Sequence, residues 1–178
     1  MINEFEFYHG VAFARMLHVV QKELAIKPYS PSDNAAYVVN GSIGIYIKYS
    51  SKRLSPWRFS FQQKHRDQIL AMKGGVGDVF VLLVCNDDGI VILTFDEFRQ
   101  VLNETHGGVE WISATRNRRQ MYSIKGSDGD LSFKVGKDDF LSKMFNLERG
   151  TSSPESADNR NVNEATGIRA EGPWEKTG

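Results

Sequence analysis

The stretch Ile43-Gly-Ile-Tyr-Ile-Lys-Tyr49, followed by Trp57-Arg-Phe-Ser-Phe61, decides the fold of this chain. In both segments one kind of side chain recurs at every second position, and both are rich in β-branched and aromatic residues, which is typical of β-strands. Residues 34–39 predict a further strand, because the turn signal Asn40-Gly41 joins them to the first segment. These three segments together predict a three-stranded antiparallel meander.

Helices and further strands are expected on both sides of this meander. Apolar residues recur at helical spacing over residues 6–24 before it and 64–72 after it. The apolar run at 79–85 predicts a buried strand, to which the second helix returns the chain. We expect the later elements, a strand, a helix capped by Asp96, a strand pair and a last helix, at residues 90–93, 96–102, 110–114, 120–125 and 138–145. This order predicts an α/β (α+β) fold with a mixed central sheet.

Length and composition favour a single domain without a membrane segment. The chain has 178 residues, of which 40% are hydrophobic and 25% are charged, as in soluble globular proteins. Its 22 Lys and Arg balance 22 Asp and Glu, so the whole molecule is not a basic nucleic-acid coat. One cysteine excludes a disulfide scaffold and a zinc site built from cysteines. The longest apolar run is far short of the about 20 residues that a membrane helix needs, and we expect a cytoplasmic protein.

The last part of the chain differs in composition from the rest. We expect residues 1–147 to form the α/β domain and residues 148–178 to form a disordered polar tail. The tail contains no Phe, Leu, Met or Tyr, so it cannot bury enough apolar surface to offset the entropy of ordering it. Its only aromatic residue, Trp174, is either incidental or an anchor for a protein partner.

Most patterns that suggest catalysis or metal binding have a simpler structural explanation. Cys85 lies within an apolar strand, where a thiol acts as a small hydrophobic group. The four histidines form no His-x-x-x-His pair. An EF-hand loop that began at Asp128 would need glycine where the chain has Phe133. The glycines of 74–77 follow a helix and precede a strand, the reverse of the order in a phosphate-binding loop.

Residues 48–66, KYSSKRLSPWRFSFQQKHR, carry the strongest functional signal. They hold six Lys and Arg and no carboxylate, with aromatic residues between them. Basic side chains attract a phosphate backbone and aromatic rings stack on bases, so this pattern favours binding of DNA or RNA. Strand periodicity predicts that Lys48, Ser50 and Arg58 lie side by side on one face. The candidate nucleic-acid-binding residues are Lys48, Ser50, Lys52, Arg53, Trp57 and Arg58, with Trp57 as packing or stacking support.

Two other interpretations of the basic stretch remain open: a solvated sheet face with ion pairs to acids elsewhere, and a surface that contacts only protein. A second basic cluster, Arg116, Arg118 and Arg119, falls in an expected hairpin loop and would extend the same surface.

The element order and the strand pair at 34–49 resemble the PD-(D/E)XK nuclease superfamily, especially its Holliday-junction resolvase-like and restriction-endonuclease-like members. The family core is a helix, a three-stranded meander, a helix and a strand. An acid on one meander strand and a Glu-x-Lys on the next bind the metal. The resemblance covers residues 5–102 and places the family lysine at Lys48 and the family acid at Asp33 or Asn34.

The chain departs from the family at the glutamate position, which holds Tyr46. A protonated phenol is a poor ligand for Mg²⁺. The resemblance would leave Asp33 as the metal ligand, joined by a helix acid such as Glu6 or Glu23, and an active enzyme would use Mg²⁺ or Mn²⁺. We expect instead a degenerate nuclease-like scaffold that binds nucleic acid and needs no cofactor.

Two alternatives belong to other functional classes. The first is an active metal-dependent DNA nuclease in which Asp33 and Lys48 are catalytic. The second is a protein-interaction subunit of a bacterial defence or mobile-element system, which would bind its partner through a sheet edge or the tail.

Overall fold

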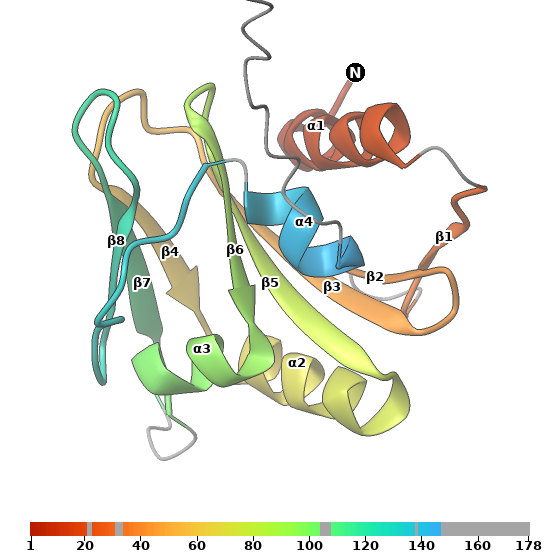
Figure 1. The fold of residues 1–178 in the computed structure, drawn as a ribbon. Coiled ribbons are helices and arrows are strands. Elements are labelled where there is room, and N and C mark those ends of the chain that lie inside the picture. The colour runs from red at the N-terminus through yellow and green to blue at the C-terminus, as the bar shows by residue number, and fades with distance from the viewer. Residues whose placement is uncertain (21–22, 31–33, 104–107, 138, 147–178) are drawn as a thin grey trace, which may run out of the picture.

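The computed structural model describes residues 1–20, 23–30, 34–103, 108–137 and 139–146, and Figure 1 shows how its elements are arranged. The expected tail and Asp33 lie outside the described residues. The elements in chain order are α1 (Glu4–Val19), β1 (Ile26–Pro28), β2 (Ala36–Val39), β3 (Ile43–Ser50), β4 (Trp57–Phe61), α2 (Gln63–Gly75), β5 (Asp78–Cys85), β6 (Gly89–Thr94), α3 (Phe95–Val101), β7 (Glu110–Thr115), β8 (Ser123–Gly126) and α4 (Asp139–Phe145).

The first sheet is mixed, as the sequence predicts. Its five strands follow the order β1-β2-β3-β5-β6. The strands β1, β2 and β3 form an antiparallel meander, β3 pairs with β5 in parallel, and β6 returns antiparallel to β5. The parallel pairing of β3 with β5 requires a crossover connection, and the chain between them contains β4 and α2. The expected α/β (α+β) class with a mixed central sheet is therefore confirmed.

The central strands of this sheet are buried on both faces. In β5, Phe80, Leu82 and Val84 belong to a core cluster with residues of α1 and α4. The alternate residues, Val81, Leu83 and Cys85 among them, belong to a second cluster with residues of α2, α3 and the second sheet. Figure 1 shows α1 and α4 on one side of the sheet. A strand that is buried on both faces is apolar throughout, which explains the continuous run in β5.

The second sheet corrects the expected meander. Its order is β4-β7-β8, so β4 is not the third strand of the meander, and β1 takes that place instead. Both edges of β3 are already paired, with β2 and β5. Strand β4 alternates strictly between buried and exposed residues, which suits a sheet with one face in water. Its apolar face packs into the core through Trp57, Phe59 and Phe61.

Two local predictions at helix ends are also wrong. The first helix ends at Val19, whereas the sequence pattern predicts helix up to residue 24, and β1 follows from Ile26. Helix α3 is capped by Thr94 instead of Asp96. The Glu97 backbone N–H donates to Thr94 Oγ1 (3.2 Å), and the Thr94 N–H donates to Glu97 Oε2 (2.8 Å). This reciprocal pair is a capping box, which stabilises a helix N-terminus.

None of the described helices has the length and apolar composition that crossing a membrane requires.

Candidate nucleic-acid interface

A cleft lies beside the last residues of β3. Strand β2 begins opposite Tyr46, so the later residues of β3 extend past the start of β2. The cleft has a volume of about 490 Å³ and is bounded by α1, β3, β4 and the residues before β2. Its polar lining consists of His9, Asn34, Lys48, Tyr49, Arg58 and Ser60. The structure thus brings Lys48 and Asn34 to one cleft.

Several polar groups of the cleft are held by neighbouring residues. His9 is buried, and its Nδ1 lies 3.0 Å from the hydroxyl of Tyr37, which donates to the carbonyl of Asn34 (2.7 Å). The Tyr49 hydroxyl donates to Glu4 Oε2 (3.4 Å). Burial and the adjacent Glu4 carboxylate raise the pKa of Tyr49 above its usual value. This phenol therefore stays protonated at neutral pH, and its proton is donated to Glu4.

The described residues do not fit a divalent metal. Tyr46, at the glutamate position of the family, is 1% exposed and packs in the core with its ring centroid 6.1 Å from that of His65. Glu6 accepts a hydrogen bond from the Asn3 N–H at the start of α1, and neither Glu6 nor Glu23 lines the cleft. No group of three or more His, Cys, Asp or Glu that could hold a metal occurs in the described part of the chain. These residues therefore supply no ligand set for Mg²⁺ or Mn²⁺.

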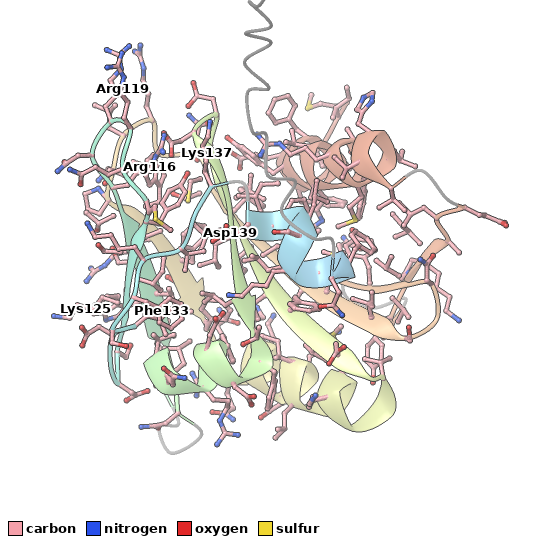
Figure 2. The ribbon with its side chains drawn as sticks, in the orientation of Figure 1. Arg116, Arg119, Lys125, Phe133, Lys137 and Asp139 are labelled. Carbon is pink, nitrogen blue, oxygen red and sulfur yellow. The ribbon has the colours of Figure 1, made fainter. Side chains whose placement is uncertain are left out.

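Two basic loops lie side by side at one end of the second sheet. One loop, residues 51–56, connects β3 to β4, and the other, residues 116–122, connects β7 to β8. The backbone N–H of Arg116 donates to Ser55 Oγ (3.1 Å), which joins the two loops. Figure 2 shows Arg119 at the tip of the second loop. Four exposed cations lie on these loops, and we refer to them as the basic loop end: Lys52, Arg53, Arg118 and Arg119.

Arg116 holds the second loop in place and is not part of this set. Its Nε and one terminal nitrogen donate to the two carboxylate oxygens of Asp88 (2.6 and 2.8 Å), in the turn between β5 and β6. The Tyr122 hydroxyl also donates to Asp88. Burial by itself would raise the pKa of Asp88, but the hydrogen bonds from Arg116 and Tyr122 outweigh it and lower the pKa. The position of the second loop thus depends on an ionised Asp88.

We expect Asp88→Asn to lower the free energy of unfolding at pH 7 by about 1.5–3 kcal/mol, because it removes the acceptor charge from the two hydrogen bonds of Arg116 and the one of Tyr122. A lowered native pKa contributes stability that is complete above the unfolded pKa of about 4 and is lost as the pH falls through the native pKa. Urea unfolding at pH 7 and pH 3 should therefore show a difference between wild type and variant that shrinks in acid. The exposed neighbour Asp87→Asn is the matched control. A difference that stays constant between the two pH values would contradict this assignment.

The outer face of the second sheet is polar and carries an aromatic residue. Its outward side chains are Arg58 and Ser60 of β4, Trp111, Ser113 and Thr115 of β7, and Ser123 and Lys125 of β8. The three strands contribute no carboxylate to this face. An isolated bridge places the exposed Asp130 beside Lys125 at its edge. We refer to these seven strand residues as the outer sheet face.

The predicted site residues fall in three places instead of one. Lys48 lines the cleft, Lys52 and Arg53 belong to the basic loop end, and Arg58 belongs to the outer sheet face as well as to the cleft wall. Ser50 ends β3, and its carbonyl accepts from the Asn86 N–H (3.0 Å). The prediction that Lys48, Ser50 and Arg58 share one sheet face is wrong, because β3 and β4 belong to different sheets.

Of the two tryptophans in the second sheet, Trp57 provides packing, which is one of the two roles expected for it, and Trp111 is the one at the surface. Trp57 is 3% exposed, and its Nε1 donates to the Lys52 carbonyl (2.8 Å), so it packs in the core and positions the first basic loop. Trp111, which is not among the nucleic-acid-binding residues predicted from the sequence, is partly exposed on the outer sheet face. The alternation of residues 110–115 is the signal for it, since Ile112 and Ala114 are buried and the residues between them face outward.

Two further predictions are confirmed in the structure: Cys85 is buried, and the glycines of 74–77 lie at a helix end and in a connection. Burial raises the pKa of the Cys85 thiol, which is fully enclosed in the core and therefore unreactive. Gly74 and Gly75 are the last residues of helix α2, and Gly77, whose N–H donates to the Ser42 carbonyl, lies in the connection to β5.

Comparisons of the chain with protein-family models, with curated proteins and with solved structures found no match.

Proposed function

We propose that this protein binds nucleic acid through a surface formed by the basic loop end and the outer sheet face. The observation that carries the proposal is the hydrogen bond between Arg116 and Ser55, because it gathers four exposed cations from two loops that are about 60 residues apart in sequence. Cations that neutralise phosphates release condensed counterions, which is the main source of sequence-independent affinity. Both loops continue directly into strands of the second sheet, so the two parts adjoin.

The zero net charge of the chain does not weaken this proposal. At physiological ionic strength the charges of exposed groups are screened beyond about 8 Å, so a local cluster decides the attraction. The partly buried Asp88 is matched by Arg116, and the three strands of the outer sheet face contribute Arg58 and Lys125 without a carboxylate. Apart from Asp130 at the edge of the outer sheet face, a phosphate backbone would therefore meet positive charges on this surface.

The element order supports a scaffold like that of the PD-(D/E)XK nucleases, for which a helix, a three-stranded meander, a helix and a strand are expected. In this chain α1, the β1–β3 meander, α2 and β5 follow in that order, with β4 inserted before α2. The buried Tyr46 at the glutamate position favours binding without cleavage. The active nuclease therefore remains the second candidate, tested in the same assay.

The test is fluorescence anisotropy with labelled single-stranded, duplex and four-way-junction DNA at 50 and 200 mM salt. Each phosphate contact adds about 0.7–0.9 to the slope of log affinity against log salt. Four contacts predict a loss of affinity of roughly 50- to 150-fold between these two salt concentrations. Lys52→Glu/Arg53→Glu removes two of the four contacts and should therefore at least halve the slope of log affinity against log salt. The matched control, Lys27→Glu/Lys64→Glu, changes the net charge equally at exposed sites on β1 and α2.

Affinity that is independent of salt and equal in both variants would overturn the proposal and favour a protein partner. The same samples with Mn²⁺ on a gel separate binding from cleavage. Cleavage that disappears in Lys48→Ala would establish the nuclease in place of the degenerate scaffold.

A further inference from the structure

We propose that Arg58 and Trp111 form a platform on which an unpaired base stacks, so that the preferred ligand is single-stranded nucleic acid. This inference rests on the proposed function, whose basic loop end would hold the backbone of the same strand. It adds a ligand class and a specific contact that the charge of the surface does not imply.

The geometry of the two side chains carries the argument. The guanidinium carbon of Arg58 lies 4.2 Å from the ring centroid of Trp111, the distance of a stacked cation–π contact. Arg58 is exposed and Trp111 is partly exposed, so the stack lies at the surface. Bases stack on aromatic rings and on the planes of arginine side chains, and this pair offers both.

The neighbours of the platform are small. In the pairing of β4 with β7, Ser60 lies opposite Trp111 and Ser113 lies opposite Arg58. On the other side, Ser127 Oγ accepts from the backbone N–H of Trp111 (2.9 Å). The residues directly opposite Trp111 and Arg58 in this strand pair are therefore both serines, whose short side chains leave room for a flat base.

The position of the platform fits a strand that continues to the loops. Trp111 and Arg116 are five residues apart along β7 and its loop, which corresponds to about 17 Å in an extended chain. A short oligonucleotide can therefore place its phosphates on the basic loop end and a base on the platform. In a duplex the faces of the bases are covered by neighbouring pairs, so only an unpaired base can use this contact.

The decisive experiment compares a 12-nucleotide oligothymidylate with an abasic oligomer of the same length and charge. A stacked base is worth between about 5-fold and about 150-fold in affinity, so the oligothymidylate should bind tighter by a factor in this range. Trp111→Ala should bring this ratio close to one and leave the affinity for the abasic oligomer unchanged. Trp111→Phe, which keeps a ring, should retain most of the ratio. An oligouridylate and a duplex of the same length complete the set and separate DNA from RNA and single from double strands.

Tryptophan emission gives a second readout, which a purely structural role of Trp111 would not change. In a Trp174→Phe background the remaining tryptophans are Trp111 and the buried Trp57. We expect the oligothymidylate to quench the emission and the abasic oligomer to leave it unchanged. Arg58→Gln removes the guanidinium from the stack and keeps Trp111. This single variant should also lower the ratio of the affinity for the oligothymidylate to that for the abasic oligomer.

The outcomes separate the two proposals. Salt-dependent binding with equal affinity for both oligomers, or tighter binding of the duplex, would overturn the platform and leave the proposed function intact. Binding of none of the probes at low salt would overturn the proposed function itself.

Discussion

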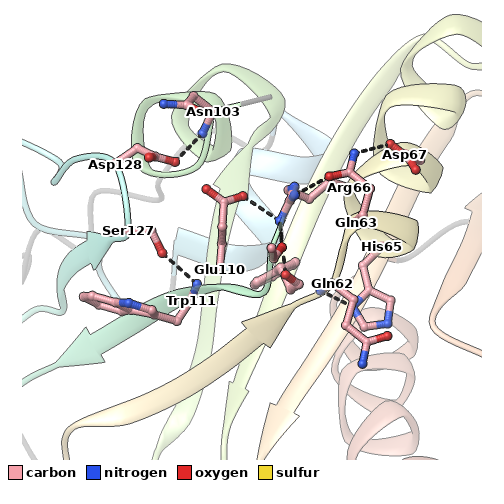
Figure 3. Close-up of polar contacts among 12 residues, drawn as sticks. Gln62, Gln63, His65, Arg66, Asp67, Asn103, Glu110, Trp111, Ser127 and Asp128 are labelled. Carbon is pink, nitrogen blue, oxygen red and sulfur yellow. Dashed lines mark hydrogen bonds and ion pairs between the residues drawn. The ribbon is translucent and has the colours of Figure 1, made fainter. Parts of the chain in front are cut away.

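Glu110→Ala is expected to lower the free energy of unfolding by about 3–5 kcal/mol, the cost of leaving one buried charge without its partner. Figure 3 shows Glu110, at the start of β7, next to Arg66 of α2. The two charges are 2.6 Å apart, and their side chains are only 5% and 4% exposed. Arg66 also donates to the carbonyls of Phe61 and Gly108, so the guanidinium is held in the core and cannot turn to water when Glu110 is removed.

Urea unfolding at pH 7 measures this effect. The double variant Arg66→Met/Glu110→Met removes both charges and should recover most of the lost stability, because apolar replacements of a whole buried pair are often neutral or stabilising. The control is Asp67→Ala, which removes an exposed acid from α2, the helix that carries Arg66. It should lower the free energy of unfolding by less than about 1 kcal/mol. A loss below 1 kcal/mol for Glu110→Ala, or a double variant that is less stable than the single one, would contradict the role of the pair.

Gly126→Ala is expected to lower the free energy of unfolding by about 3 kcal/mol, at the upper end of the range for overpacking. A Cβ atom at this position would lie 2.1 Å from the carbonyl oxygen and 2.7 Å from the carbonyl carbon of Val101. Both are backbone atoms at the end of α3, so no side-chain rotation can relieve the clash. The N–H of Asp128 donates to the same carbonyl (3.1 Å), which fixes the distance between β8 and α3.

The same substitution elsewhere should have the opposite sign. Gly10 lies exposed in α1, and a Cβ atom there would meet nothing within 4 Å. Gly10→Ala should therefore stabilise the protein by about 0.5–1 kcal/mol through its higher helix propensity. Thermal melts should give a lower melting temperature than wild type for Gly126→Ala and a higher one for Gly10→Ala. Equal effects of the two substitutions would contradict the close approach of β8 to α3.

The alternation of side chains identified most strands because it depends only on neighbouring residues. Strands β3, β4, β5 and β6 and helix α2 lie where their patterns predict them, apart from a few residues at their ends. Strand β1 was missed because it has three residues, too few to show a period. The N-cap of α3 was misassigned by two residues, since Thr94 and Asp96 are both residues that cap helices.

The candidate site was predicted only as a set of residue types. The sequence indicated that the basic residues around Arg53 and Arg118 are unusual in a neutral chain. The four cations of the basic loop end are indeed exposed. The alternation of residues 110–115 indicates that Trp111 lies on the face opposite to Ile112 and Ala114, but only the packing of the second sheet decides that this face is the outer one.

By itself, the sequence determined the fold class, the central buried strand and the basic character of the loop after β3, because each follows from local composition and period. Only the tertiary structure decided that β4 leaves the first sheet, since that depends on β2 and β5 occupying both edges of β3. The tertiary structure also decided which cations lie together. Ser55 and Arg116 are 61 residues apart, and no local pattern records a hydrogen bond between residues so distant in the chain.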